Sequence, residues 1–166
     1  SNIDNEFLKM IVDEGHIYHY LNDSNGNSVV YYVFLRDLES NCNREETSLL
    51  SKIFGNDKEC FMSLMVSRDL FHLVSKIIER KNLFLLDFFL KKGMGSFTSR
   101  NFVGKTLYHV AIDHDSLEGL QMLISNLTDD LGLSDLDWAD FFLYAASHGS
   151  REILSYLISH DLSNIN

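Results

Sequence analysis

The sequence predicts an all-α protein built as a solenoid, in which short helix-turn-helix units of about 34 residues stack on one another. Apolar side chains make up 45% of the 166 residues, so the chain can bury one sizeable core. Apolar stretches of helix length end at glycines, and similar segments surround Ile77, Ala111 and Ala145 at a spacing of 34 residues. A unit this small cannot bury its apolar face alone, so neighbouring units must cover it.

The units are expected to follow one another in a single domain spanning residues 1–166. They are, in order, a partial unit 3–15, unit 16–57, an irregular unit 58–93, unit 94–130 and unit 131–161. In the partial unit, EFLKMIVDEG reads as an apolar helix that ends in two charged residues and a glycine. The stretch 41–66 is about ten residues too long for one unit, so we expect a lengthened loop or an extra helix there.

The clearest unit, 94–130, contains the stretch GKTLYHVAIDHDSLEGLQMLIS, residues 104–125. Gly104 suits a hairpin turn that requires positive φ, and Thr106 is placed to cap the following helix with its hydroxyl. Apolar residues then recur at the spacing of two short helices, each with one buried face. Gly15, Gly93 and Gly149 suit helix ends or turns between helices, where a left-handed residue is favoured.

The motif Asn101-x-x-Gly104-x-Thr106-Leu-Tyr-His109-Val-Ala111 resembles the ankyrin repeat, whose unit reads D-x-x-G-x-T-P-L-H-x-A. DSNGNS, residues 23–28, is a looser copy of the same turn. The resemblance covers most of the chain, but strongly only from about residue 70 to 161. At the start of the first helix of a unit, the family's proline is replaced by Val29, Leu107 or Phe141.

The charge of the chain excludes several classes of partner. The formal net charge is −10, and basic residues are scattered, with Lys91-Lys92 among the few adjacent pairs, so we expect no nucleic acid and no acidic membrane surface as partner. The longest apolar run, Leu83 to Leu90, is interrupted by Asp87 and is too short to span a bilayer. The two cysteines, Cys42 and Cys60, are too few to form a disulfide framework, and they are not spaced as zinc ligands are. Their number and spacing favour a reducing, intracellular compartment.

We expect no metal, no cofactor and no enzyme activity. His109 and Asp113 are four residues apart on one helix face, which is a spacing that metal ligands use. The ankyrin resemblance instead implies that His109 makes structural hydrogen bonds between neighbouring units. The pair His16 and His19 has no evident third ligand. Neither cysteine lies in a catalytic motif, and no glycine loop could cradle a phosphate.

The resemblance implies a protein-protein interaction module, in which hairpin tips and the ends of the first helices line a concave face. Phe102, at a hairpin tip, is the best single contact residue, although it could instead tuck against the adjacent hairpin. The full set of expected partner-binding residues is Asn25, Asn27, Leu35, Arg36, Glu79, Arg80, Phe102, Val103, Lys105, Asp113, His114, Asp137, Ala139, Ser147 and His148.

The expected partner is another protein with a basic patch, bound by a monomeric scaffold. By analogy, the chain is expected to be a segment of a larger ankyrin-containing protein, such as a secreted effector of an intracellular bacterium that acts in the host cytoplasm. Two alternatives stay open. The chain could be the substrate-recognition arm of a larger enzyme, or it could hold a small catalytic site within 41–66.

Overall fold

The computed structural model describes residues 5–13, 22–40, 48–56, 70–92, 100–126 and 134–164. These residues form helices and the turns between them, which confirms the predicted all-α class. The chain divides into two compact units, Ser1–Leu73 and Val74–Asn166, which are treated separately below, and the expectation of a single domain stays a prediction. None of the described helices is both long and apolar enough to cross a bilayer.

The first compact unit holds α1 (Asn5–Asp13), α2 (Val29–Glu39) and α3 (Leu49–Asn56), and α1 packs against both of the others. Ser28 caps α2, because its hydroxyl accepts a hydrogen bond from the N–H of Tyr31 at 3.2 Å. The buried carboxylate of Asp37 ties α2 to the start of α3. It accepts hydrogen bonds from the Ser48 hydroxyl at 2.8 Å and from the Leu50 N–H at 2.9 Å.

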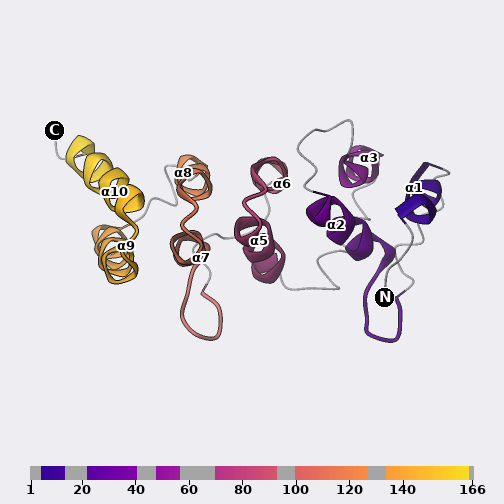
Figure 1. Ribbon diagram of the computed structural model, residues 1–166, viewed down its shortest axis with the longest axis horizontal. Coiled ribbons are helices and arrows are strands. Elements are labelled where there is room, and N and C mark those ends of the chain that lie inside the picture. The colour runs from indigo at the N-terminus through magenta and orange to yellow at the C-terminus, as the bar shows by residue number, and fades with distance from the viewer. Residues whose placement is uncertain are drawn as a thin grey trace. The chain divides into compact units, whose positions relative to one another are not determined.

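The second compact unit holds three pairs of consecutive helices. They are α5 (Leu70–Glu79) with α6 (Leu83–Lys91), α7 (Leu107–Asp113) with α8 (Leu117–Ser125), and α9 (Asp135–His148) with α10 (Arg151–Asn164). The boundary between the two compact units falls within α5. First helices pack on first helices, since α7 contacts α9, and second helices on second helices, since α6 contacts α8 (Figure 1).

The turn inside each helix pair recurs every 34 residues. Its first residue has a left-handed backbone in all three copies, with φ of 52° at Lys81, 47° at Asp115 and 71° at Gly149. The N–H of the next residue then donates to a carbonyl five residues earlier. These bonds run from Asn82 to Ile77 at 3.1 Å, from Ser116 to Ala111 at 2.8 Å and from Ser150 to Ala145 at 3.3 Å. The three residues that the sequence placed at the centres of successive units therefore occupy the same place in successive turns.

The buried positions of the three helix pairs follow the same period. Four positions in each pair are buried in all three copies, two on the first helix and two on the second. They are Leu73, Leu107 and Phe141; Ile77, Ala111 and Ala145; Leu85, Gly119 and Ile153; and Phe89, Leu123 and Leu157. Each pair thus has one buried apolar face, and it is burial of this face that holds short helices of 7 to 14 residues in place.

A glycine hairpin precedes α2 in the first compact unit and α7 in the second. Gly26 and Gly104 have φ of 77° and 80°. In each hairpin the residue three positions before the glycine, Asp23 or Asn101, accepts hydrogen bonds through its side chain from two N–H groups of the turn. Its own N–H donates across the turn at 2.9 Å in both cases. The predicted equivalence of DSNGNS and the hairpin before α7 is therefore confirmed.

The start of α9 differs from the prediction. Counting by the period placed a helix start at Phe141, but α9 begins at Asp135, so Phe141 lies in its middle. Ser134 and Asp137 form a capping box there, with the Ser134 hydroxyl accepting from the Asp137 N–H at 3.3 Å. Asp137 and Ala139 consequently lie on a helix and not at a hairpin tip, and this part of the predicted partner-binding surface was wrong in its geometry.

Several predictions concern residues outside the described parts of the chain. These include Gly15, Gly93, the pair His16 and His19, and both cysteines. Within the long stretch 41–66, the structure describes residues 48–56, most of which form α3. Gly149, in contrast, adopts the predicted left-handed conformation at the end of α9.

Candidate functional site

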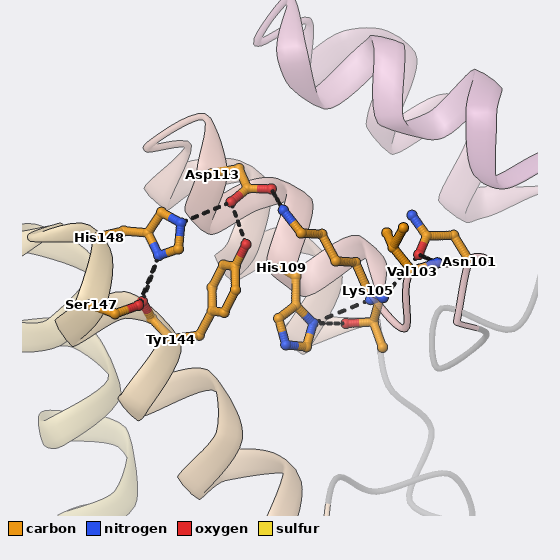
Figure 2. Close-up of polar contacts among 9 residues, drawn as sticks. Asn101, Val103, Lys105, His109, Asp113, Tyr144, Ser147 and His148 are labelled. Carbon is orange, nitrogen blue, oxygen red and sulfur yellow. Dashed lines mark hydrogen bonds and ion pairs between the residues drawn. The ribbon is translucent and has the colours of Figure 1, made fainter.

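A cluster of polar side chains joins the end of α7 to α9, and Asp113 lies at its centre (Figure 2). Lys105 Nζ is 2.6 Å from Asp113 Oδ2, and the Tyr144 hydroxyl donates to Oδ1 at 2.6 Å. His148 Nε2 lies 3.4 Å from the same Oδ1. The Lys105 ammonium also lies 5.4 Å from the centre of the Tyr144 ring, at cation–π distance. One carboxylate therefore binds Lys105, from the hairpin before α7, and Tyr144, from α9, and it lies close to a third side chain, that of His148.

These contacts shift the pKa values of the cluster. Burial acts to raise the pKa of Asp113, but the hydrogen bonds from Lys105 and Tyr144 together outweigh it, and the net pKa is lowered. The hydrogen bond to Asp113 raises the pKa of Lys105. Burial, followed by the same hydrogen bond to Asp113, raises the pKa of Tyr144. At neutral pH these shifts favour an ionised Asp113, a charged Lys105 and a neutral Tyr144 phenol. None of the three pKa values is shifted toward neutral pH, as proton exchange would require.

Ser147, His148 and Asp113 lie in a row, as the groups of a nucleophilic site would. The orientation of the imidazole argues against that chemistry. His148 Nδ1 is 2.9 Å from the carbonyl oxygen of Tyr144, so it carries a proton that the carbonyl accepts. It cannot then take a proton from the Ser147 hydroxyl 3.0 Å away, which itself donates to that carbonyl at 2.7 Å. The His148 ring also stacks on Tyr144 at 4.2 Å between centroids.

His109 has a structural position between α7 and α9. Its Nδ1 accepts from the N–H of Thr106 at 3.2 Å, and the two residues form a reciprocal cap at the start of α7. The ring proton therefore belongs on Nε2, which lies 3.2 Å from Asp140 Oδ2 on α9. Burial lowers the pKa of His109, against the opposing effect of Asp140. This agrees with the expected structural role, since His109 and Asp113 have different partners.

Arg100 connects the hairpin to the N-terminal part of α9. One guanidinium nitrogen donates to the carbonyl of Gly104 at 2.7 Å. The other lies 3.6 Å from Asp140 and 3.9 Å from Asp137. The carboxylates of Asp137 and Asp140 stay partly exposed, at 36% and 45%, and they form an acidic border next to the hairpin.

The tip of the hairpin projects two apolar side chains into solvent. Phe102 is 100% exposed and Val103 is 59% exposed, so Phe102 does not tuck against a neighbour. The backbone beneath them is held in place because Asn101 Oδ1 accepts from the N–H of Val103 at 3.0 Å and of Lys105 at 2.9 Å. A wholly exposed phenylalanine on a backbone fixed by side-chain hydrogen bonds is an unusual surface feature, and it marks this tip as a candidate contact.

The structure brings some of the predicted partner-binding residues together and separates others. Lys105, Asp113, Ser147 and His148 share the cluster, Phe102 and Val103 form the tip beside it, and His114 is exposed at the end of α7. Glu79 and Arg80 are exposed where α5 ends.

The remaining predicted residues belong to the first compact unit. Asn25 is exposed at the tip of the first hairpin, whereas Asn27 is buried and donates to Asp23. Leu35 and Arg36 lie half-buried on α2, where Arg36 pairs with Asp37 at 2.7 Å.

Sequence reasoning missed Arg100, Asp140 and, most importantly, Tyr144. An aromatic residue at this helical spacing is typical of a core, yet the Tyr144 hydroxyl reaches Asp113 from α9. A signal was available, since Tyr144 precedes His148 by four residues and therefore lies on the same face of a helix. Arg100 immediately precedes the hairpin motif and carries no pattern of its own.

The described residues offer no ready site for a metal, because no three of their histidine, cysteine, aspartate or glutamate side chains lie close enough to share an ion. Comparison of the chain with protein-family models, with curated protein sequences and with solved structures found no match.

Proposed function

We propose that this chain is a protein-binding module of the ankyrin type, and that the hairpin tip of Phe102 and Val103 is its principal contact with a partner protein. The observation that carries the proposal is the complete exposure of Phe102 on a hairpin whose backbone is fixed by Asn101. A large aromatic side chain with few rotatable bonds, carried on a fixed backbone, loses little entropy on binding, which is typical of residues that dominate interfaces.

The ankyrin assignment is supported by local geometry. The glycine hairpins before α2 and α7 share the same hydrogen bonds, and the turns within the three helix pairs of the second compact unit share theirs. First helices contact first helices, and second helices contact second helices, as stacked repeats require.

The surroundings of the tip favour a partner with an apolar pocket and a basic border. Asp137 and Asp140 border the hairpin on α9 and remain partly exposed. The two nearby cations, Arg100 and Lys105, are already paired with carboxylates of this chain. With a net charge of −10, the chain attracts basic surfaces and accelerates their association at low salt.

The experiment that tests the proposal is photo-crosslinking from position 102. A photoreactive phenylalanine analogue replaces Phe102, and the same analogue at Glu118, an exposed residue of α8, is the control. We expect a specific protein to be crosslinked from position 102 and not from position 118. The same set of proteins from both positions would reject the tip as the contact.

Substitution provides the quantitative test on the protein so identified. Phe102→Asp should weaken binding at least about tenfold, with an unchanged melting temperature because the side chain is fully exposed. Phe7→Asp on α1, an exposed phenylalanine of the first compact unit, should leave that binding unaltered. Equal effects of the two substitutions would contradict the proposal.

The catalytic alternative and the role in a larger enzyme stay predictions, as do the secreted-effector origin and the host-cytoplasm location. No contact of the described residues favours any of them over a binding module.

A further inference from the structure

The last helix pair exposes positions that the two earlier pairs bury. Residues 34 apart occupy equivalent places in the three pairs. On the first helix, Val74 and Tyr108 are 0% exposed, whereas the equivalent Phe142 is 40% exposed. Ile78 and Ile112 are 1% exposed, whereas the equivalent Ala146 is exposed. On the second helix, Leu90 and Ile124 are 6% and 8% exposed, whereas the equivalent Ile158 is 48% exposed. Leu143 is 68% exposed, whereas its equivalent in the pair before, His109, is 4% exposed.

The earlier pairs bury these positions because the next pair packs on them. Tyr108 of α7, for example, contacts Phe141 of α9 at 4.9 Å between ring centroids. On α6, Leu86 lies against α8 so closely that a β-carbon at Gly119 would contact it at 3.8 Å. The exposed face of α9 and α10 thus presents the positions through which the earlier pairs pack on a neighbour, and its large exposed side chains, those of Phe142, Leu143 and Ile158, are apolar.

The exposed side of α9 has a pattern that suits a copy of itself. Ala139, Phe142, Leu143 and Ala146 are all exposed, and their spacing of three, four and seven residues aligns them on one side of the helix. The order small, large, large, small reads the same in both directions. Two such stripes placed antiparallel therefore match along their whole length.

We propose that this stripe is the interface of a homodimer, in which α9 packs antiparallel on α9 of a second copy about a two-fold axis. The axis passes between Phe142 and Leu143. Phe142 then faces Leu143 of the second copy, and Ala139 faces Ala146 of the second copy. A two-fold contact closes on itself, so it buries the exposed face without forming a filament. Ile158 on α10 extends the apolar surface beside it.

Electrostatics favour this position for a contact between like-charged molecules. Each copy carries a net charge of −10, yet the four residues of the stripe carry none. Repulsion then acts only between charges outside the contact, where salt screens it. The dimer should consequently strengthen as salt is raised, opposite to the salt dependence expected for the basic partner of the Phe102 tip. A dimer would differ from the monomer expected from the sequence.

Sedimentation velocity of the whole chain over a range of concentrations tests the dimer. Leu143→Glu should raise the dimer dissociation constant at least about tenfold. Phe102→Glu, the matched change at an exposed apolar residue outside the stripe, should leave it unaltered. A wild-type chain that stays monomeric up to hundreds of micromolar, or a dimer indifferent to Leu143→Glu, would overturn the proposal.

A charge-swap experiment tests the antiparallel register. Phe142→Lys and Leu143→Glu should each weaken the homodimer, because each places two charges against apolar side chains. In a mixture of the two variants, the introduced lysine would face the introduced glutamate on one side of the axis, while the remaining leucine and phenylalanine face each other on the other side. A heterodimer should therefore form. Melting curves confirm that each variant is folded, and failure of folded variants to associate when mixed would reject this register.

Discussion

The hydroxyl of Tyr144 donates to Asp113 Oδ1 at 2.6 Å, and this bond joins α9 to the end of α7 across 31 residues of sequence. The other oxygen of Asp113 binds Lys105 at 2.6 Å, so the bond belongs to a small network and not to an isolated pair. The network lies at the step between two consecutive helix pairs. It couples the hairpin that carries Phe102 to the helix that follows, and its loss should weaken that step.

Tyr144→Phe should lower the free energy of unfolding by about 1 kcal/mol, because it deletes a hydrogen bond to a charged acceptor at a partly exposed site. Urea denaturation monitored by circular dichroism measures the change. Tyr156→Phe on α10 is the matched control, since burial raises the pKa of that phenol but no hydrogen bond to Asp113 is lost. Equal effects of the two substitutions would show that the bond adds no stability.

The stability of the second compact unit should fall as the pH is lowered from 7.5 to 5.5. Burial lowers the pKa of His109 below its ordinary value of 6.5, so near that value the unfolded chain binds more protons than the folded chain. The stabilising contribution is thus fully present above about pH 6.5 and is lost as the pH falls toward the folded pKa. Urea titrations at several pH values measure this.

The control for the pH dependence is a variant of an exposed histidine. His109→Gln should flatten the dependence, whereas His114→Gln, at the exposed end of α7, should leave its slope unaltered. A slope that persists in His109→Gln would assign the effect to another group.

Tyr108→Phe should leave stability unchanged or raise it by up to about 1 kcal/mol. Tyr108 is fully buried, and its hydroxyl has no hydrogen-bond partner among the residues that the structure describes. Burial also raises its pKa. Removing the hydroxyl keeps the ring packing against Phe141 and removes an uncompensated polar group. Thermal melting checks this, and a clear loss of stability would indicate that the hydroxyl has a partner.

Because the turn recurs, introducing a glycine at one copy and removing the glycine from another should change stability in opposite directions. Asp115→Gly should stabilise the protein by about 0.5–1 kcal/mol, because Asp115 adopts φ of 47°, which costs a residue with a β-carbon energy. Gly149→Ala should destabilise the protein by about 1 kcal/mol through the same backbone strain. A steric clash does not contribute, because an added β-carbon would meet nothing within 4 Å. Denaturant midpoints measure both, and changes of the same sign would contradict an equivalent turn at the two positions.

The sequence predicts local, periodic features of this fold well. Ile77, Ala111 and Ala145 were placed in equivalent positions because apolar burial imposes the same period on every helix pair. The two glycine hairpins were predictable because few residues adopt positive φ at Gly26 and Gly104 without strain.

Features set by local capping or by distant contacts were not predictable from the period. Ser134 caps α9 well before Phe141, since a capping box with Asp137 overrides the repeat. The role of Tyr144 depends on Asp113, 31 residues away, and no sequence pattern joins the two. The exposure of Leu143 follows from its place in the last of the described helix pairs, which its own residue type does not reveal.

The central claim is that a single turn geometry recurs every 34 residues and sets up equivalent, stacked helix pairs. Its most direct test is the backbone conformation of Lys81, Asp115 and Gly149 in solution, measured by NMR from intraresidue HN–Hα distances and scalar couplings in the whole chain. The account predicts positive φ at all three residues, with slow amide exchange at Asn82, Ser116 and Ser150. Negative φ at Lys81 or Asp115 would contradict it.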